Sequence, residues 1–376
     1  MRNKNQQVQI IAEIGTAHEG NISKAKELIQ AAAYAGADFV KFQWVYADEI
    51  LHPDTGIVTL PGGQIRLYDR FKQLELPVEF FAEVKAYAKS CGCGFICSPF
   101  GLRSLKELLS INPDAIKIAS PELNHFPLLN ELAKTRNNIP VILSSGVSTL
   151  SDIEKALSIF NDKESVSLLH CITSYPAPPD EYNLSLIKNL KNIFGVSTGV
   201  SDHSMHPYIV PVLSTCFGAT QIEKHITLSR KTDGLDDPVA LEPEDFSLMV
   251  KQVRQTEKII SEYGETQGLS KVIENLSTEF EQNYISNVIG NGIKKLADSE
   301  KANYGRTNRS IHFMNNMKKG EIITEDSVSV LRTEKILTPG ISPEYLTEII
   351  GSTLTKDVTS GQGVEWKHIT TSFSDT

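Results

Sequence analysis

The sequence Phe194-Gly195-Val196-Ser197-Thr198-Gly199-Val200 leads directly into Ser201-Asp202-His203, and Ala219-Thr220-Gln221-Ile222 leads into Glu223-Lys224-His225. Each is a short apolar run of strand character that ends in a histidine-containing triplet. In a barrel of parallel strands, side chains at the C-terminal strand ends converge on one mouth. Two histidines there could hold one metal ion, with the acidic residue before each histidine orienting its ring. The alternative for either histidine alone is a buried ring that simply has a hydrogen-bond partner.

Strand-like and helix-like segments alternate eight times between residues 8 and 264. Strands are expected at 8–13, 39–42, 94–97, 115–118, 141–143, 166–170 and in the two histidine runs. Helices are expected at 23–35, 78–90, 102–109, 127–134, 150–160, 184–190, 207–217 and 244–263, with Asn21 or Ser23 capping the first. Eight such units are the number that closes a (β/α)8, or TIM, barrel. An open doubly wound sheet is the alternative.

The alternation stops after residue 264. Residues 271–306 are polar and contain Gly290-Asn291-Gly292 and Tyr304-Gly305, which is typical of a connecting segment. Three short strand-like runs with turn residues between them follow at 309–313, 317–323 and 327–332. The sequence therefore predicts a barrel domain over 1–270, a linker over 271–306 and a small C-terminal domain over 307–376.

Charge and composition exclude several classes of protein. The 46 acidic residues outnumber the 37 basic ones and give a net charge of -9, which disfavours binding to nucleic acid or to an anionic membrane. The polar N-terminus and the lack of a long apolar stretch lead us to expect a cytoplasmic protein. Five cysteines in apolar contexts suit reduced thiols rather than a disulfide framework. An anionic small substrate remains compatible with this charge if lysines are concentrated in a cleft.

Polar residues follow each expected strand, at the positions that would form the mouth of a barrel. They include Glu13, Glu19, Lys41, Gln43, Ser98, Lys117, Ser120, Ser144, Thr173 and Tyr175. Two lysines and several hydroxyls beside a metal are the groups that hold a phosphorylated anion. Each group also has a structural alternative, because the lysines could pair with a carboxylate such as Glu13 and the serines could cap the following helices.

The motifs together resemble those of the sialic acid synthase family over nearly the whole chain. They are Ile11-Ala12-Glu13-Ile14-Gly15, His18-Glu19-Gly20, Lys41-Phe42-Gln43, Lys117-Ile118-Ala119-Ser120, Tyr175-Pro176-Ala177-Pro178, the two histidine triplets, Gly234-Leu235-Asp236 and Leu241-Glu242-Pro243. The segment from Arg309-Ser310-Ile311 through Gly340-Ile341-Ser342-Pro343 to Gly351 resembles the antifreeze-like (SAF, β-clip) domain of the same enzymes.

The resemblance implies a metal-dependent transferase that makes nonulosonic acids. It would condense phosphoenolpyruvate with an open-chain N-acylated hexose, such as N-acetylmannosamine or a diacetamido-dideoxyhexose, and release phosphate by C–O cleavage. His203 and His225 would bind the divalent metal, usually Mn²⁺, with Mg²⁺ as an alternative. Glu19 and Lys117 would complete the catalytic set of the two histidines.

The resemblance also assigns the substrates to particular residues. Phosphoenolpyruvate would be held by Lys41, Gln43, Ser98, Lys117, Ser120, Ser144 and Ser201. The sugar would contact Glu19, Thr173, Tyr175, Asp236 and, from a partner subunit, Arg309. The working unit would then be a domain-swapped homodimer.

Two departures from the family bear on the sugar. Thr173 stands where neuraminate-making bacterial members have asparagine, and Gly234-Leu235-Asp236-Asp237 differs from the Gly-Pro-Asp-His pattern of neuraminate and legionaminate enzymes. Two other functions are compatible with parts of the pattern. One is a Schiff-base aldolase with Lys41 or Lys117 as the nucleophile. The other is a non-catalytic carbohydrate-binding protein.

Overall fold

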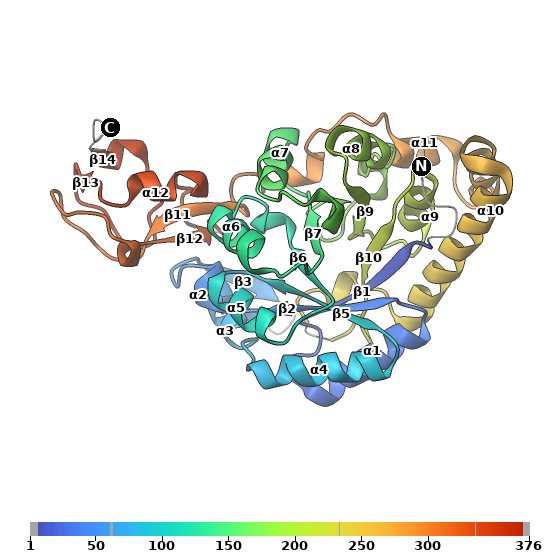
Figure 1. Ribbon diagram of the computed structural model, residues 1–376, viewed down its shortest axis with the longest axis horizontal. Coiled ribbons are helices and arrows are strands. Elements are labelled where there is room, and N and C mark those ends of the chain that lie inside the picture. Colours follow the sequence, from blue (N-terminus) through green and yellow to red (C-terminus); the bar gives the residue numbers. More distant parts are fainter. Residues whose placement is uncertain (1–6, 61–62, 233, 335, 371–376) are drawn as a thin grey trace.

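Parallel strands close into a barrel in the order β1-β10-β9-β8-β7-β6-β5-β2 (Figure 1). A computed structural model describes residues 7–60, 63–232, 234–334 and 336–370. The barrel strands are β1 (Gln9–Gly15), β2 (Phe39–Trp44), β5 (Gly94–Pro99), β6 (Ala115–Ile118), β7 (Val141–Ser144), β8 (Val166–Cys171), β9 (Ser197–Asp202) and β10 (Gln221–His225). The predicted TIM barrel is confirmed, and the open sheet is wrong because β1 pairs with both β2 and β10.

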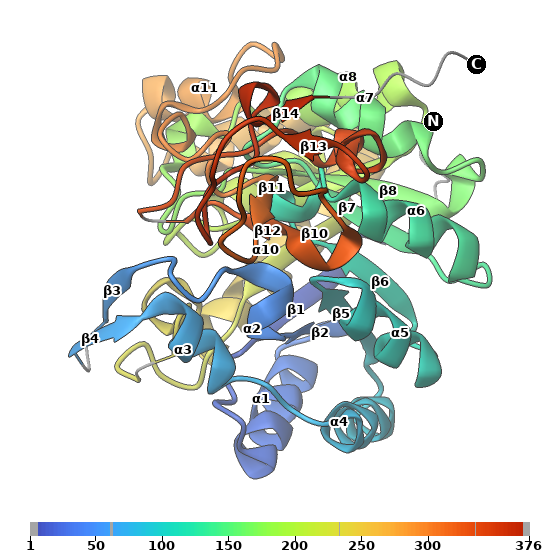
Figure 2. The same ribbon diagram turned by 90° about the vertical axis from the view of Figure 1, so that its left-hand side faces the viewer.

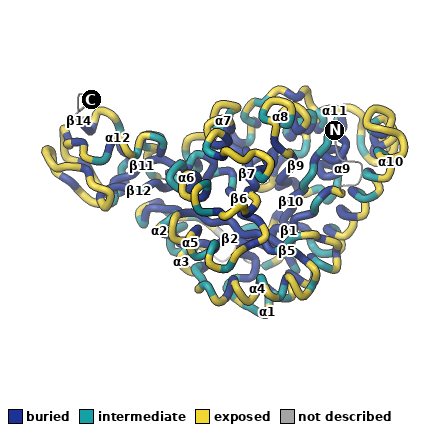
Figure 3. The backbone as a smooth tube through the Cα atoms, viewed as in Figure 1, coloured by how far each residue is buried: buried dark blue, intermediate teal, exposed yellow. Residues whose placement is uncertain are grey.

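Helices follow the barrel strands and cover the outside of the barrel. They are α1 (Ile22–Tyr34), α4 (Val78–Ser90), α5 (Leu102–Ser110), α6 (Phe126–Thr135), α7 (Leu150–Ser158), α8 (Leu186–Phe194), α9 (Ile209–Cys216) and α10 (Pro243–Leu276). Asn21 caps α1, since its side chain accepts hydrogen bonds from the amides of Ser23 and Lys24. Figure 3 shows the strands buried and the outer helices with exposed outer faces. None of the described helices has the length and apolar character that a membrane span requires.

The segment between β2 and α4, for which the sequence predicts no strand or helix, contains regular structure. It holds α2 (Ala47–Ile50), the antiparallel hairpin of β3 (Ile57–Leu60) and β4 (Gly63–Arg66), and α3 (Leu67–Lys72). The β3–β4 hairpin and α3 lie toward the edge of the molecule, whereas α2 packs against β12 of the C-terminal domain (Figure 2). Because β4 is largely exposed and each element is at most six residues long, no apolar period marks them in the sequence.

The predicted linker, residues 271–306, is packed onto the barrel, and we call it the connector. Helix α10 bends at Gly264, which has φ 78°, and continues to Leu276. The connector then contains α11 (Gln282–Ile289) and the 3-10 helix η5 (Asp298–Glu300). Val272, Leu276 and Ile285 of this region are buried in the main apolar core together with barrel residues. The connector is therefore part of the barrel domain and not a free tether.

The C-terminal domain lies beside the barrel, next to α2 and α6 (Figure 1). It pairs β11 (Arg309–Phe313) with β12 (Val328–Arg332), and β13 (Thr353–Leu354) with β14 (Ile369–Thr370), around a separate apolar core. It also contains η6 (Glu325–Ser327), η7 (Pro343–Tyr345), α12 (Leu346–Ile349) and η8 (Trp366–His368). The strand predicted at 317–323 is wrong, because this stretch makes only isolated bridges at Met317 and Ile322. The last six residues of the predicted domain, 371–376, lie outside the described residues, as do 1–6.

Candidate active site

A cavity of about 390 Å³ opens at the C-terminal ends of the barrel strands. Most of the site residues predicted from the sequence line it: Lys41, Gln43, Lys117, Ser120, Ser144, Thr173, Tyr175, Ser201, His203, His225 and Asp236. They come from strand ends or from the loops just after them, which is the location of active sites in barrels of this type. The structure thus gathers residues that are up to 195 positions apart in sequence, from Lys41 to Asp236.

One side of this cavity, which we call the lysine side, is formed by buried ion pairs. The Nζ of Lys41 lies 2.9 Å from Glu13 Oε2 and 3.5 Å from Glu223 Oε1. Lys117 donates a 2.6 Å hydrogen bond to Ser144 Oγ and lies 3.9 Å from Glu223 Oε2. The alternative that these lysines pair with carboxylates therefore also holds in the structure. Two cations and two carboxylates share one small volume here.

Burial and pairing have opposite effects on these groups. Burial lowers the pKa of Lys41, but Glu13 and Glu223 outweigh it and raise that pKa above its usual value. Burial lowers the pKa of Lys117, with Glu223 opposing this and Lys41 adding to it, so that its pKa falls below the usual lysine value. Although burial raises the pKa of Glu223, the two lysines lower it to about 2. Glu223 is therefore ionised at neutral pH and serves as the counter-charge of the two lysines. An anionic ligand could take its place as their partner.

The other side, which we call the histidine side, is aromatic. The ring centroids of His203 and His225 are 5.5 Å apart, and the Tyr175 ring stacks on His203 at 4.2 Å. His203 Nδ1 lies 2.8 Å from the carbonyl oxygen of Ile172, and its Nε2 lies 3.2 Å from the Tyr175 hydroxyl. Asp236 Oδ2 lies 3.8 Å from His225 Nδ1.

The two imidazoles differ in basicity. Burial lowers the pKa of His225 to about 4, so this ring is neutral near pH 7. Burial also lowers the pKa of His203, but Cys171 and the Ile172 carbonyl outweigh it and raise that pKa to about 9. Two neighbouring rings are thus held in different protonation states. A metal ion bound by His203 near pH 7 would have to displace the proton from this ring, so metal binding would release a proton.

The arrangement fits a divalent metal bound by only two protein side chains. If His203 donates through Nδ1 to the Ile172 carbonyl, its Nε2 lone pair faces the cavity, as does the neutral ring of His225. Among the described residues, no group of three or more His, Cys, Asp and Glu side chains is arranged to hold a metal. Water and substrate oxygens would therefore have to complete the coordination, which suits a catalytic site with open positions.

The expectation that the acidic residue before each histidine orients its ring is wrong. Asp202 accepts a 2.6 Å hydrogen bond from Lys224 Nζ and a 2.8 Å bond from the Ser204 amide. Successive side chains of a strand point to opposite faces, so Asp202 and Lys224, which directly precede the histidines, face away from the cavity. Glu223 does face the cavity. Its carboxylate pairs with the lysines and accepts a hydrogen bond from Ser201, and it makes no hydrogen bond to either imidazole of the described site.

Three of the predicted residues lie away from the cavity lining, and two of them, Glu19 and Ser98, belong to the barrel domain. Glu19, with φ 50°, directs its carboxylate to Arg70 of α3, where Oε2 lies 2.7 Å from Nη2. Ser98 is the strand neighbour of Gln43 and is fully buried, and its hydroxyl has no partner among the described residues. The sequence put both residues near the mouth, but the direction of a loop side chain depends on contacts that no local pattern encodes.

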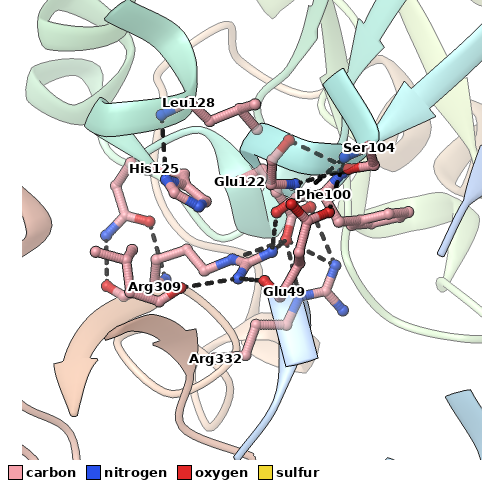
Figure 4. Close-up of polar contacts among 11 residues, drawn as sticks. Glu49, Phe100, Ser104, Glu122, His125, Leu128, Arg309 and Arg332 are labelled. Atoms are coloured by element: carbon pink, nitrogen blue, oxygen red, sulfur yellow. Dashed lines mark hydrogen bonds and ion pairs between the residues drawn. The ribbon is translucent and has the colours of Figure 1, made fainter. Parts of the chain in front are cut away.

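Arg309 is also placed differently from the expectation (Figure 4). Its guanidinium is fully buried and pairs with Glu122 of its own barrel at 3.0 Å, and it also donates to the Phe100 carbonyl at 2.8 Å. Arg332, its partner across the β11–β12 pair, donates to the same carboxylate through Nε at 2.9 Å. Of these two arginines, it is Arg332 that lines the cavity. A contribution of Arg309 to a partner subunit stays a prediction.

The cavity residues nearest the C-terminal domain were not predicted from the sequence. They are Asn303 of the connector and Thr307, Arg332 and Glu334 of the C-terminal domain. The other site residues were predicted because they follow barrel strands. These residues follow no barrel strand, so their position in the sequence does not predict that they line the cavity. The family resemblance pointed to Arg309 of β11. The arginine that lines the cavity is its neighbour Arg332 on the adjacent strand, β12.

The closed barrel and the charged cavity at the C-terminal ends of its strands define a (β/α)8-barrel enzyme. Comparison with known proteins then identifies the family. Residues 28–265 match the NeuB family and residues 308–370 match the SAF domain. The chain belongs to the NeuB family, the family of sialic acid synthases that its motifs resemble.

Individual relatives match over nearly the whole chain. An N,N'-diacetyllegionaminic acid synthase of Campylobacter jejuni is 32% identical, over 93% of this chain and 96% of its own. A pseudaminic acid synthase of the same species is 30% identical, over 96% of this chain and 97% of its own. The crystal structure of the spore coat polysaccharide biosynthesis protein SpsE of Bacillus subtilis is 30% identical and covers 97% of this chain and 96% of its own, with a TM-score of 0.79.

Proposed function

We propose that the protein is a nonulosonic acid synthase that condenses phosphoenolpyruvate with the open-chain form of an N-acylated hexose. The observation that carries the proposal is the cavity itself, in which a compensated lysine pair lies next to two imidazoles. Relatives named legionaminic and pseudaminic acid synthases support it. The five cysteines are free thiols, which agrees with our expectation of a cytoplasmic enzyme.

Phosphoenolpyruvate would bind on the lysine side. Its anionic groups would take over Lys41 and Lys117 from Glu13 and Glu223, while hydroxyls supply directed hydrogen bonds. The amide and hydroxyl groups available in the cavity for this purpose are those of Gln43, Ser120, Ser144 and Ser201. Ser98 lies behind this lining as the strand neighbour of Gln43, so we assign it no direct contact.

The sugar would bind on the histidine side, against Tyr175, Asp236 and Thr173. A divalent metal held by His203 and His225, Mn²⁺ by family resemblance, would supply Lewis-acid chemistry toward the aldehyde oxygen. Tyr175 fixes the ring plane of His203 by stacking, and the Ile172 carbonyl fixes its tautomer. With the two substrates bound in this way, the aldehyde carbon would lie on the histidine side and the methylene carbon of phosphoenolpyruvate on the adjacent lysine side.

Bond formation between these two carbons leaves positive character at C-2 of the pyruvyl group. Water adds there, and the resulting tetrahedral carbon expels phosphate with cleavage of its C–O bond, so that one water is consumed for each phosphate released. Glu13 and Glu223 are the carboxylates on the lysine side that line the cavity, and they would stabilise this positive charge. Glu19, paired with Arg70, is left without that role in our proposal.

The proposal is tested by phosphate release from phosphoenolpyruvate across a panel of N-acetylmannosamine and diacetamido-dideoxyhexoses. We expect release with at least one sugar, loss of release after treatment with a chelator and recovery when Mn²⁺ is added back. Release that is insensitive to chelation would contradict the metal role. Sugar binding without any release would instead indicate a carbohydrate-binding protein.

A Schiff-base aldolase is the second candidate, because the lowered pKa of Lys117 makes its amine the better nucleophile of the two lysines. Borohydride added with pyruvate would trap a covalent adduct on that lysine if this function is correct. We expect no adduct, since Lys117 already donates to Ser144 and lies beside Glu223. An adduct located at Lys117 by peptide mass would favour the aldolase.

We also propose that the working unit is a domain-swapped homodimer, as the family resemblance implies. The Arg309–Glu122 and Arg332–Glu122 contacts would then form between subunits in the same geometry that they have within the chain. Sedimentation of the purified protein tests this directly. A monomer with full activity would contradict it.

A further inference from the structure

The connector places one buried carboxylate between two loops of the barrel mouth. Glu300 is only 1% exposed, and its Oε1 accepts hydrogen bonds of 2.7 Å from the amides of both Val147 and Thr173. Val147 follows β7 and Thr173 follows β8, so a single side-chain oxygen joins two neighbouring loops. The second oxygen, Oε2, accepts from the amide of Ala297 at 3.3 Å.

The loop after β7 is held in an unfavourable backbone conformation. Val147 has φ 42°, a left-handed value that a β-branched residue rarely adopts and that persists only where surrounding contacts enforce it. Those contacts come from Glu300 of the connector and from Asn308 at the start of the C-terminal domain. Glu300 accepts a hydrogen bond from the Val147 amide, and Asn308 Nδ2 donates one of 3.1 Å to the Val147 carbonyl. Lys294 Nζ also donates to the carbonyl of Ser145 at 3.1 Å.

This conformation brings the β7 loop close to Thr173. A Cβ atom added at Gly146 would lie 2.1 Å from Thr173 Oγ1 and 2.9 Å from Ser120 Oγ. The Gly146 amide donates to Ser120 Oγ at 3.0 Å, so the phosphoenolpyruvate side of the cavity is tied to the same loop. Any shift of the β7 loop would therefore move the walls around Thr173 and Ser120 together.

The side chain of Thr173 lies at the cavity wall, and its hydroxyl makes no hydrogen bond to the described residues. The residue is 9% exposed and lines the cavity, its amide is held by Glu300, and its hydroxyl has no hydrogen-bond partner among the described residues. A buried hydroxyl without a partner costs free energy, which a ligand hydroxyl or amide in the cavity would recover.

We infer that Glu300 is a positioning residue that clamps the loops after β7 and β8 and so presents the Thr173 hydroxyl to the sugar. The inference rests on the proposed synthase function for the identity of the ligand, but the clamp itself does not. A carboxylate suits this role better than an amide. With one oxygen accepting from Val147 and Thr173, the NH₂ of a glutamine would face the Ala297 amide, donor against donor.

The test combines amide exchange with steady-state kinetics. In Glu300→Gln we expect faster hydrogen exchange in peptides covering 144–149 and 172–175, and kcat/KM for the sugar reduced by about 100-fold through misplacement of the loops. The KM for phosphoenolpyruvate should rise as well, because the Gly146 amide ties Ser120 on the phosphoenolpyruvate side to the same loop. Thr173→Val should lower kcat/KM for the sugar about tenfold without lowering the melting temperature, since the lost hydroxyl has no partner in the free protein.

Two controls separate positioning from general destabilisation. Thr173→Ser keeps the hydroxyl and should retain most of the activity. Tyr304→Phe removes a connector contact to Asp152 outside the cavity, a 3.0 Å hydrogen bond, and should change neither exchange nor kinetics. If Glu300→Gln does not fold, Asn308→Ala releases the Val147 carbonyl and gives the exchange readout for the peptide covering 144–149 alone.

Unchanged exchange of both peptides in a folded clamp variant would overturn the clamp. Unchanged sugar kinetics in Thr173→Val would overturn the role of its hydroxyl. If the wild-type protein releases no phosphate with any sugar, the proposed function fails, while the exchange measurement still decides whether Glu300 clamps the two loops.

Discussion

The two sides of the cavity are built by different means. On the lysine side, charged groups hold one another: Lys41 lies between Glu13 and Glu223, and Lys117 lies close to Glu223. On the histidine side, backbone groups and ring stacking hold the functional side chains, as the Ile172 carbonyl and Tyr175 do for His203. On the lysine side, an anionic ligand can replace the carboxylates as the partners of the lysines. On the histidine side, the contacts fix the positions of the rings without adding charged groups. Substitutions on the lysine side should therefore mainly lower stability, and substitutions on the histidine side should mainly lower catalytic activity.

The largest effect on stability is expected for Lys41→Met. Removing this cation leaves Glu13 and Glu223 buried close together with one counter-charge fewer, and breaking a buried pair costs about 3–5 kcal/mol. Urea unfolding should show this loss in the free energy of unfolding. The double variant Lys41→Met/Glu13→Gln should recover a large part of it. A single variant as stable as the wild type would contradict the picture of mutually compensating charges.

On the histidine side, His203→Ala should affect catalysis far more than folding. We expect phosphate release to fall by about 100- to 1000-fold, because a group that stabilises developing charge is lost, while the variant still folds. His206→Asn, in the loop that follows and outside the cavity lining, is the matched control. Normal release by His203→Ala with Mn²⁺ in excess would remove the metal role from this residue.

The cavity residues nearest the C-terminal domain should show a smaller effect. Arg332→Met removes a cavity residue but leaves Glu122 paired with Arg309, so the C-terminal domain should stay docked. We expect KM for the sugar to rise about tenfold, as for one lost hydrogen bond or ion contact. Truncation before Arg309 removes both arginines and should disable sugar binding further. Full activity of the truncated chain would show that the C-terminal domain does not complete the site.

Acid should weaken the folded protein through histidines that neither side of the cavity uses. Burial lowers the pKa of His18 to about 4 and that of His170 to about 3, against 6.5 in the unfolded chain. Between these values the unfolded chain binds more protons, so stability is full above pH 6.5 and is lost as the pH falls toward 4. Each histidine contributes a slope of up to about 1.4 kcal/mol per pH unit. The unfolding free energy of His18→Leu should depend less on pH between 6.5 and 5, and an unchanged slope would contradict this contribution.

Much of the barrel and of the cavity could be predicted because both follow strand periodicity. A strand end fixes which mouth a residue faces, so Lys41, Lys117, His203 and His225 could be placed together without a structure. The same period, applied within each triplet, would have predicted that Asp202 faces away from the histidines.

The remaining features depend on contacts distant in sequence. Glu300 and Arg332 reach the cavity through the packing of the connector and the docking of the C-terminal domain, and no local pattern encodes these. The hairpin of β3 and β4 was missed because four-residue strands with exposed side chains carry no apolar period. Glu19 and Arg309 were assigned by resemblance, which transfers a residue type but not the partner that the side chain finds in this chain.

The outward-facing pair of Asp202 and Lys224 has a consequence for how this site can change over time. Each triplet serves two environments at once, with a histidine turned inward and a charged neighbour locked to the next strand. Insertion or deletion of a single residue in β9 or β10 would exchange these roles, sending imidazoles to the outer wall and an ammonium or carboxylate into the cavity. Length variation in these two strands should therefore be far rarer among descendants of this chain than substitution within them.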